Sequence, residues 1–292
     1  MERLSQNDRD DPLGALTLAI RRHPRFNEAA RKYVGRVVEW RRGLGYFNRA
    51  GTNLGFHVIN YVAFLHFAAR NRAVEHGATV ANLLRICETR ENCGQATLRT
   101  VLTALTLLGR LKTGRSESDR RIQVFVPSDT LMREMCEVYG FSLGVLDDLL
   151  QNTACAHKMI EDPDFIGRVV YGSGRAIIED DVRITEPFPE LHEIITMPGG
   201  LPTSVSLAAA SMTGTAFPAP HAIAKDFKLS TSQVRSVLNA LVDFGLVARG
   251  IGGQITETGR LVDDHKSLIA RELALHVKYA LGLEHRISKA VV

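Results

Sequence analysis

Apolar positions recur at helical spacing along much of the chain. Between residues 27 and 42 an apolar stripe lies opposite several Arg and Lys residues, which predicts an amphipathic helix. Residues 54–74 are apolar on most sides, so we expect a central helix or a helix at an oligomer interface. A last helix is expected over residues 260–281. The pattern therefore predicts a mainly α-helical protein.

Two short helices and two short strands are predicted after the long apolar helix. Residues 79–87 form the first helix, with Thr79 as its N-cap residue, and residues 94–108 form the second. Residues 110–113 and 121–126 resemble strands and are joined by a charged loop. Helix, turn, helix and hairpin is the order of elements in a winged helix-turn-helix unit.

The same order returns near the C-terminus. Residues 220–227 predict a short helix, and Ser230 is the expected N-cap residue of a longer helix that ends at Phe244. Residues 246–249 and 254–256 predict a hairpin around a Gly-rich loop. A second winged helix-turn-helix unit is therefore expected.

The two units are related in sequence. A shift of 136 residues places residues 98–114 on residues 234–250, and seven of the seventeen positions are identical. These positions are Arg99, Val101, Leu102, Ala104, Leu105, Gly109 and Gly114. Repetition at this long period indicates two domains rather than a solenoid. We expect N-terminal helices and the first unit in residues 1–150, and an acidic connector, the second unit and a C-terminal helix in residues 151–292.

Composition places the chain among globular proteins. Hydrophobic residues make up 45% of the 292 residues and charged residues 23%, which excludes a mainly disordered chain. No apolar run is long enough for a transmembrane helix, and no secretory signal is visible. The four cysteines form no CxxC pair, so neither a disulfide scaffold nor a structural zinc site is expected. These features predict a cytoplasmic protein that does not contact membranes.

Charge is distributed unevenly along the chain. Residues 1–128 contain 21 Lys and Arg against 11 Asp and Glu, whereas residues 161–193 contain 3 against 9. Because a polyanion releases counterions when its phosphates are neutralised, the basic half favours a nucleic-acid partner. The acidic segment is expected to face away from that partner.

Candidate contacts to double-stranded DNA lie on the second helix of each unit and on the hairpins. A recognition helix presents polar side chains to base edges in the major groove. In the two units these side chains are Gln95, Thr97, Arg99, Thr100 and Thr103, and Thr231, Gln233, Arg235, Ser236 and Asn239. The hairpins add Arg110, Lys112, Arg115, Arg120, Arg121 and Arg249 as contacts to phosphates or to the minor groove. Asp119 is expected to bridge an Arg and to hold the first hairpin.

Both hairpin regions resemble one protein family. Leu108-Gly109-Arg110-Leu111, Ser118-Asp119-Arg120-Arg121 and residues 124–127 are similar to the wing of the MarR family of bacterial transcriptional regulators, which holds an Asp-x-Arg element. Residues 245–247 and 255–260 resemble the same region but lack that element. Family members are typically single-copy chains that dimerise through terminal helices. The resemblance implies a covalently fused pseudo-dimer, with the helices at 27–74 and 260–281 as its interface.

Other chemistry has little support in the sequence. Residues 169–175 are similar to a strand followed by a GxGxxG loop, but Ile177 occupies the third Gly position, so a strand and turn or an interdomain connector is expected. No serine elbow, HExxH motif or phosphate loop is present, so we expect no catalytic residue, metal, cofactor or enzymatic activity. A small-molecule effector and a homodimer through residues 54–74 are further candidate partners.

The sequence therefore predicts a sequence-specific, DNA-binding transcriptional regulator. A replication initiator, which can also carry two winged helices, and a protein-interaction module with degenerate winged helices are the alternatives. Repeated sites at an origin would indicate the initiator. Absence of a salt-dependent DNA affinity would indicate the interaction module.

Overall fold

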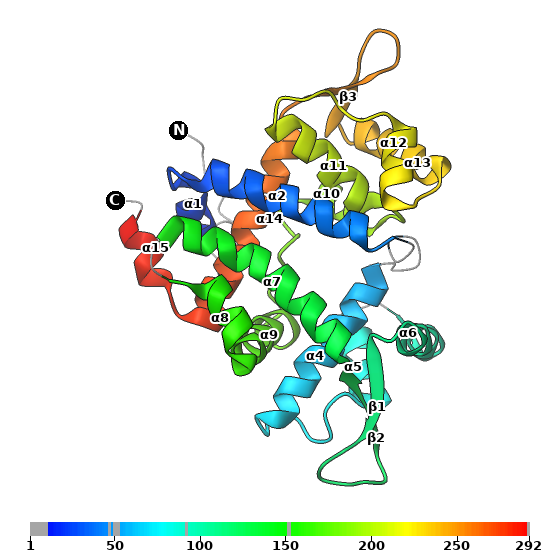
Figure 1. Ribbon diagram of the computed structural model, residues 1–292, viewed down its shortest axis with the longest axis vertical. Helices are drawn as coiled ribbons and strands as arrows, with labels where there is room; N and C mark the ends of the chain where they lie inside the picture. Colours follow the sequence, from blue (N-terminus) through cyan, green and yellow to red (C-terminus); the bar gives the residue numbers. More distant parts are fainter. Residues whose placement is uncertain (1–10, 46–47, 49–52, 91–92, 151–152, 291–292) are drawn as a thin grey trace.

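The chain is mainly α-helical and carries two small antiparallel hairpins (Figure 1). A computed structural model describes residues 11–45, 48, 53–90, 93–150 and 153–290. The first half consists of α1 (Gly14–Arg22), α2 (Phe26–Gly43), α4 (Asn53–Arg70), α5 (Val80–Thr89), α6 (Gln95–Leu107), β1 (Leu111–Arg115), β2 (Gln123–Pro127) and α7 (Asp129–Leu150). The second half consists of α8 (Cys155–Glu161), α9 (Pro163–Ile178), α10 (Pro189–Thr196), α11 (Gly200–Met212), α12 (Pro220–Phe227), α13 (Thr231–Asp243), β3 (Val247–Arg249), β4 (Ile255–Glu257), α14 (Arg260–Leu275), the π-helical segment η2 (His276–Leu281) and α15 (Glu284–Ala290). Among the described residues, no helix has both the length and the apolar character needed to cross a membrane.

One order of elements occurs twice, and local signals place its helix ends. The hydroxyl of Thr79 accepts a hydrogen bond from the backbone N–H of Asn82 at 3.1 Å and caps α5. A reciprocal capping box between Ser230 and Gln233 begins α13. Gly109 and Gly245 follow α6 and α13 with φ of +69° and +68°, a conformation that favours glycine. The predicted helix–helix–hairpin order is confirmed in both halves.

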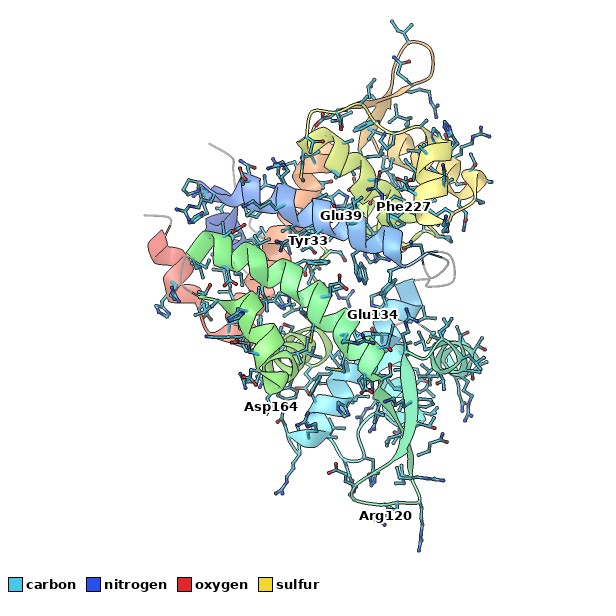
Figure 2. The ribbon with its side chains drawn as sticks, viewed as in Figure 1. Tyr33, Glu39, Arg120, Glu134, Asp164 and Phe227 are labelled. Atoms are coloured by element: carbon cyan, nitrogen blue, oxygen red, sulfur yellow. The ribbon has the colours of Figure 1, made fainter. Side chains whose placement is uncertain are left out.

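Long helices interlock the two halves. α1 packs along α14, and α8 packs along α7, so the first helix of each half lies on the last long helix of the other. In the same way α2 contacts α7 and α11, whereas α9 contacts η2 and α4. These matching pairs relate the halves as a twofold axis relates two subunits. At their meeting point Glu272 of α14 accepts hydrogen bonds from Tyr33 of α2, at 3.0 Å, and from Ser142 of α7. Figure 2 labels Tyr33 on α2.

The segment 169–175 is helical, so the prediction of a strand and turn is wrong. Glycine has a packing role here. A Cβ at Gly172 would lie 2.4 Å from the carbonyl oxygen of Tyr279, and one at Gly174 would lie 2.7 Å from the ring of Phe64. The glycines of α9 therefore let η2 and α4 approach its backbone closely.

The apolar helix predicted over residues 54–74 is the central helix α4 of the first half. It ends at Arg70, four residues early, because Arg72 and His76 adopt left-handed backbone conformations. The helix packs against α5, α6, α9 and β2, and its exposed described residues are His57, Asn60 and Arg70. No large apolar side chain of the described part of α4 is fully exposed, and the homodimer through this helix stays a prediction.

Helix α14 buries a neutral histidine that makes stability depend on pH. His265 is 3% exposed, no described residue forms a hydrogen bond with its Nε2, and burial lowers its pKa to about 4. Below pH 6.5 the unfolded chain takes up a proton that the folded chain does not accept until about pH 4. The free energy of unfolding should therefore decrease as the pH falls through this window.

His265→Leu should reduce the loss of stability between pH 7 and pH 5 by about 2 kcal/mol, because each pH unit below the unfolded pKa corresponds to about 1.4 kcal/mol. Urea denaturation at both pH values measures the effect. The exposed His221 offers a matched control, and His221→Leu should leave the pH dependence unchanged. An equal loss of stability in wild type and His265→Leu would contradict the prediction.

Candidate nucleic-acid interface

The two repeated units lie at opposite ends of the molecule. Figure 1 shows the β1–β2 hairpin at one end of the long axis and the β3–β4 hairpin at the other. Helices α6 and α13 lie on the same side of this view, whereas α1 and α15 lie on the opposite side. The side that carries α6 and α13 is therefore the candidate interface.

The outer face of α6 is polar and free of acids. Leu98, Leu102 and Leu105 are buried and fix which face points outward. All five predicted residues of this helix are exposed, namely Gln95, Thr97, Arg99, Thr100 and Thr103. The hydroxyls of Thr100 and Thr103 donate to the carbonyls of Ala96 and Arg99, at 3.0 and 2.9 Å, so their oxygens remain available as acceptors. No described residue forms an ion pair with Arg99, which leaves its guanidinium available to an external acceptor.

Helix α13 presents a smaller polar face. Arg235, Ser236 and Asn239 are exposed, and Thr231 is partly exposed. Gln233 is committed elsewhere, because its side-chain oxygen accepts from the backbone N–H of Ser230 at 2.9 Å and from the Ser230 hydroxyl at 3.1 Å. The predicted base contact through the Gln233 oxygen is thus corrected to a capping role.

The first hairpin directs cationic side chains outward. Arg115, Arg120 and Arg121 are exposed, and Figure 2 shows Arg120 at the outer end of the hairpin. The carboxylate of Asp119 accepts the backbone N–H of Arg121 at 2.9 Å, which holds the turn. Asp119 does hold this hairpin, but through a backbone N–H and not through the predicted guanidinium.

Two predicted contacts of this hairpin form ion pairs within the chain. Nη2 and Nε of Arg110 donate to the two carboxylate oxygens of Glu134 on α7, at 2.7 and 3.2 Å, as a bidentate pair. Nη1 of Arg110 donates to the Leu108 carbonyl at 2.9 Å. Arg110 therefore joins the end of α6 to α7 and leaves the set of candidate DNA contacts. Lys112 pairs with Asp129 at 2.9 Å, but both side chains are largely exposed, so water screens the pair.

Sequence analysis missed a histidine at the base of the first hairpin. Nδ1 of His76 lies 2.8 Å from the hydroxyl of Ser118 and 3.2 Å from that of Ser116. The backbone N–H of Phe125 on β2 also donates to the carbonyl of Ala78, at 2.9 Å. The segment before α5 therefore fastens the hairpin to its helices. Its partners are about forty residues apart in sequence, so no local pattern indicates them.

The second hairpin is nearly uncharged. Arg249 donates to the side-chain oxygen of Asn239 at 2.8 Å, which joins this hairpin to α13. Its tip contains Gly252 and Gly253, with φ of +90° and +81°, and the fully exposed side chain of Ile251. The two hairpins therefore differ in charge and in their contacts to the preceding helix.

Metal and thiol chemistry have little support in the described residues. Among the described residues, no group of His, Cys, Asp or Glu side chains is arranged to hold a metal ion. Cys87 is buried next to Cys93, and burial together with a hydrogen bond between the two thiols raises the pKa of Cys87 to about 12. This thiol is therefore protonated at neutral pH.

A cleft of about 510 Å³ lies between α2 and α7. A smaller cavity of about 200 Å³ lies among α4, α5 and the end of α9. Both lie away from the outer faces of α6 and α13, so neither belongs to the candidate nucleic-acid interface.

The candidate interface is defined by the predicted contact residues that the structure leaves accessible. Among the predicted contacts, those that are at least partly exposed and form neither an ion pair nor a hydrogen bond to another described side chain are Gln95, Thr97, Arg99, Thr100, Thr103, Arg115, Arg120, Arg121, Thr231, Arg235 and Ser236. Arg115 donates to the backbone carbonyl of Arg121 at 3.2 Å. No protein-family model, curated protein or solved structure matches the chain.

Proposed function

We propose that this protein is a sequence-specific transcriptional regulator that binds double-stranded DNA through two winged helix-turn-helix units on one chain. One observation carries the proposal. Two exposed, polar helix faces without acids before Asp243 lie on one side of the molecule, and each is followed by a hairpin. Carboxylates on these faces would repel phosphates, so their absence supports a DNA contact.

Each of the two units reads one half-site. Arg99 and Arg235 occupy equivalent positions on α6 and α13, and arginine can bind O6 and N7 of guanine in bidentate fashion. The exposed arginines of the first hairpin then contact phosphates or a narrow minor groove. A pseudo-twofold chain suits two half-sites about one helical turn, or about 34 Å, apart. Because the two helix faces differ, the half-sites differ as well.

Selection from a pool of random duplexes with the purified protein tests the proposal. We expect a single motif of two unlike half-sites. The logarithm of its affinity should fall with the logarithm of salt concentration with a slope of about −3 or steeper, as three or more neutralised phosphates give. No enrichment together with no salt-dependent binding would contradict a DNA-binding function.

Arg99→Ala should relax the preference for one base pair in one half-site by about 10- to 100-fold, since a bidentate contact contributes about 1–3 kcal/mol of discrimination. Arg235→Ala is the matched variant and should relax the other half-site. Repeating the selection with each variant measures both effects. Variants that alter the same positions, or no positions, would contradict the assignment of one half-site to each helix.

A protein-interaction module is the second candidate. Leu107 and Leu108 at the end of α6 are 83% and 46% exposed, and Ile251 is fully exposed, so each unit offers apolar surface to a protein partner. Absence of a salt-dependent DNA affinity would favour this function. Enriched sites clustered as repeats at an origin, away from promoters, would instead favour a replication initiator.

A further inference from the structure

The cleft between α2 and α7 combines aromatic and acidic side chains. Its lining residues are Arg36, Glu39, Trp40, Gly43, Leu44, Glu134, Glu137 and Phe141. Figure 2 labels Glu39 on α2 and Glu134 on α7, the two helices that form its walls. A volume of about 510 Å³ falls in the range of about 300–1,000 Å³ that small-molecule sites occupy.

The charges of the lining residues are unbalanced. Glu134 is already paired with Arg110, but no described residue forms an ion pair with Glu39 or Glu137. Arg36 is the single cationic lining residue, and no ion pair joins it to either carboxylate. The cleft therefore holds two exposed, unpaired carboxylates and one guanidinium beside the half-buried rings of Trp40 and Phe141. The buried Arg41 lies over one face of the Trp40 ring, 5.1 Å from its centroid, so a ligand would use the other face.

Rings and carboxylates together select one class of ligand. The face of an aromatic ring attracts a cation, and indole does so most strongly. Carboxylates supply the opposite charge, and the ring surfaces cover an apolar body. We propose that this cleft binds a small organic cation, a protonated or quaternary amine with an aromatic or branched apolar body.

The cleft is lined by residues of the first half of the chain, so we expect one cation per chain.

A cation in the cleft acts on the end of α6. Glu134 lines the cleft and holds Arg110, and Arg110 also donates to the carbonyl of Leu108 directly after α6. An ammonium group near Glu134 competes with Arg110 for the carboxylate and weakens the ion pair that joins the end of α6 to α7. In this respect the inference rests on the proposed DNA function, because the expected consequence is a weaker grip of α6 on its half-site.

Trp40 makes the binding step measurable without DNA. It is the single tryptophan among the 292 residues, so intrinsic tryptophan fluorescence reports on the cleft alone. Titration with benzyltrimethylammonium should give a saturable change with one site per chain, whereas benzyl alcohol and benzoate should give none at the same concentrations. No saturable change with the ammonium, or an equal response to benzoate, would overturn the cation site.

Paired variants identify the carboxylates. Glu39→Gln combined with Glu137→Gln should raise the Kd for benzyltrimethylammonium at least tenfold. Glu28→Gln is the control, because Glu28 is exposed on the same helix but does not line the cleft. An unchanged Kd in the double variant, with unchanged circular dichroism, would overturn the assignment.

DNA separates the two proposals. With the selected duplex, saturating benzyltrimethylammonium should weaken binding at least fivefold, and the duplex should weaken ammonium binding by the same factor because linkage is reciprocal. Arg110→Ala should abolish this coupling, while the fluorescence titration stays saturable with an equal or lower Kd because Glu134 is then unpaired. Saturable fluorescence without any DNA binding would remove the proposed function and leave the cation site. DNA binding without an ammonium response would keep the proposed function and overturn the cation site.

Discussion

Reversing the charge of Arg120 and Arg121 should weaken the binding of every DNA sequence by about 100-fold or more near physiological salt, because two favourable phosphate contacts become repulsive. Both side chains are exposed at the outer end of the first hairpin, and no described residue pairs with them. Asp119 holds the turn through the backbone N–H of Arg121, which Arg121→Glu retains. The hairpin should therefore keep its fold while its charge changes.

The dependence on salt tests this explanation. Loss of two phosphate contacts should make the slope of log affinity against log salt shallower by about 1.8. Arg22 and Arg31 are exposed on α1 and α2, away from the hairpin, and Arg22→Glu with Arg31→Glu makes the same change in net charge. A similar loss of affinity in this control would assign the effect to net charge and contradict a local contact.

Replacing Arg271 by Met should reduce the free energy of unfolding by about 3–5 kcal/mol, the usual cost of removing one partner of a buried ion pair. Its side chain is 5% exposed, and its guanidinium pairs with Asp11. It also donates to the carbonyls of Ile184 and Arg183, at 3.0 and 3.1 Å. Met fills similar volume but leaves both carbonyls without this donor, and the carboxylate keeps only the backbone N–H of Leu13.

Urea denaturation of wild type and Arg271→Met measures this loss. Burial alone would raise the pKa of Asp11, but the hydrogen bond and charge of Arg271 and the backbone N–H of Leu13 hold it below its usual value. The ionised pair therefore stabilises the fold above about pH 4, and this contribution disappears as the pH falls through the lowered pKa. The difference between the two proteins should shrink in acid. A loss below about 1 kcal/mol at pH 7 would contradict the structural role of Arg271.

Sequence patterns predict the parts of this fold that depend on neighbouring residues. Thr79 and Ser230 cap helices through side chains that reach three residues ahead, so their role is readable locally. The glycines after α6 and α13 mark helix ends in the same way. The turn predicted around Gly172 is wrong, because a glycine that opens a turn and one that admits a neighbouring helix are identical in sequence.

Contacts between distant residues decide what the sequence could not predict. Arg110 looks like the other arginines of its hairpin until α7 brings Glu134 beside it. His76 gains its partners when the segment before α5 meets the hairpin. The pairing of α1 with α14 and of α8 with α7 likewise joins segments far apart in the chain. The division of the chain at residue 150 stays a prediction.

The unlike hairpins give the molecule a direction. A symmetric dimer on a palindrome looks the same from either end, so turning it around changes nothing. Here an arginine-rich hairpin lies at one end and a glycine-rich hairpin with Ile251 at the other. A chain bound to two unlike half-sites would point one way along the duplex, and inverting its site would turn the cleft and both termini to face the other neighbouring gene.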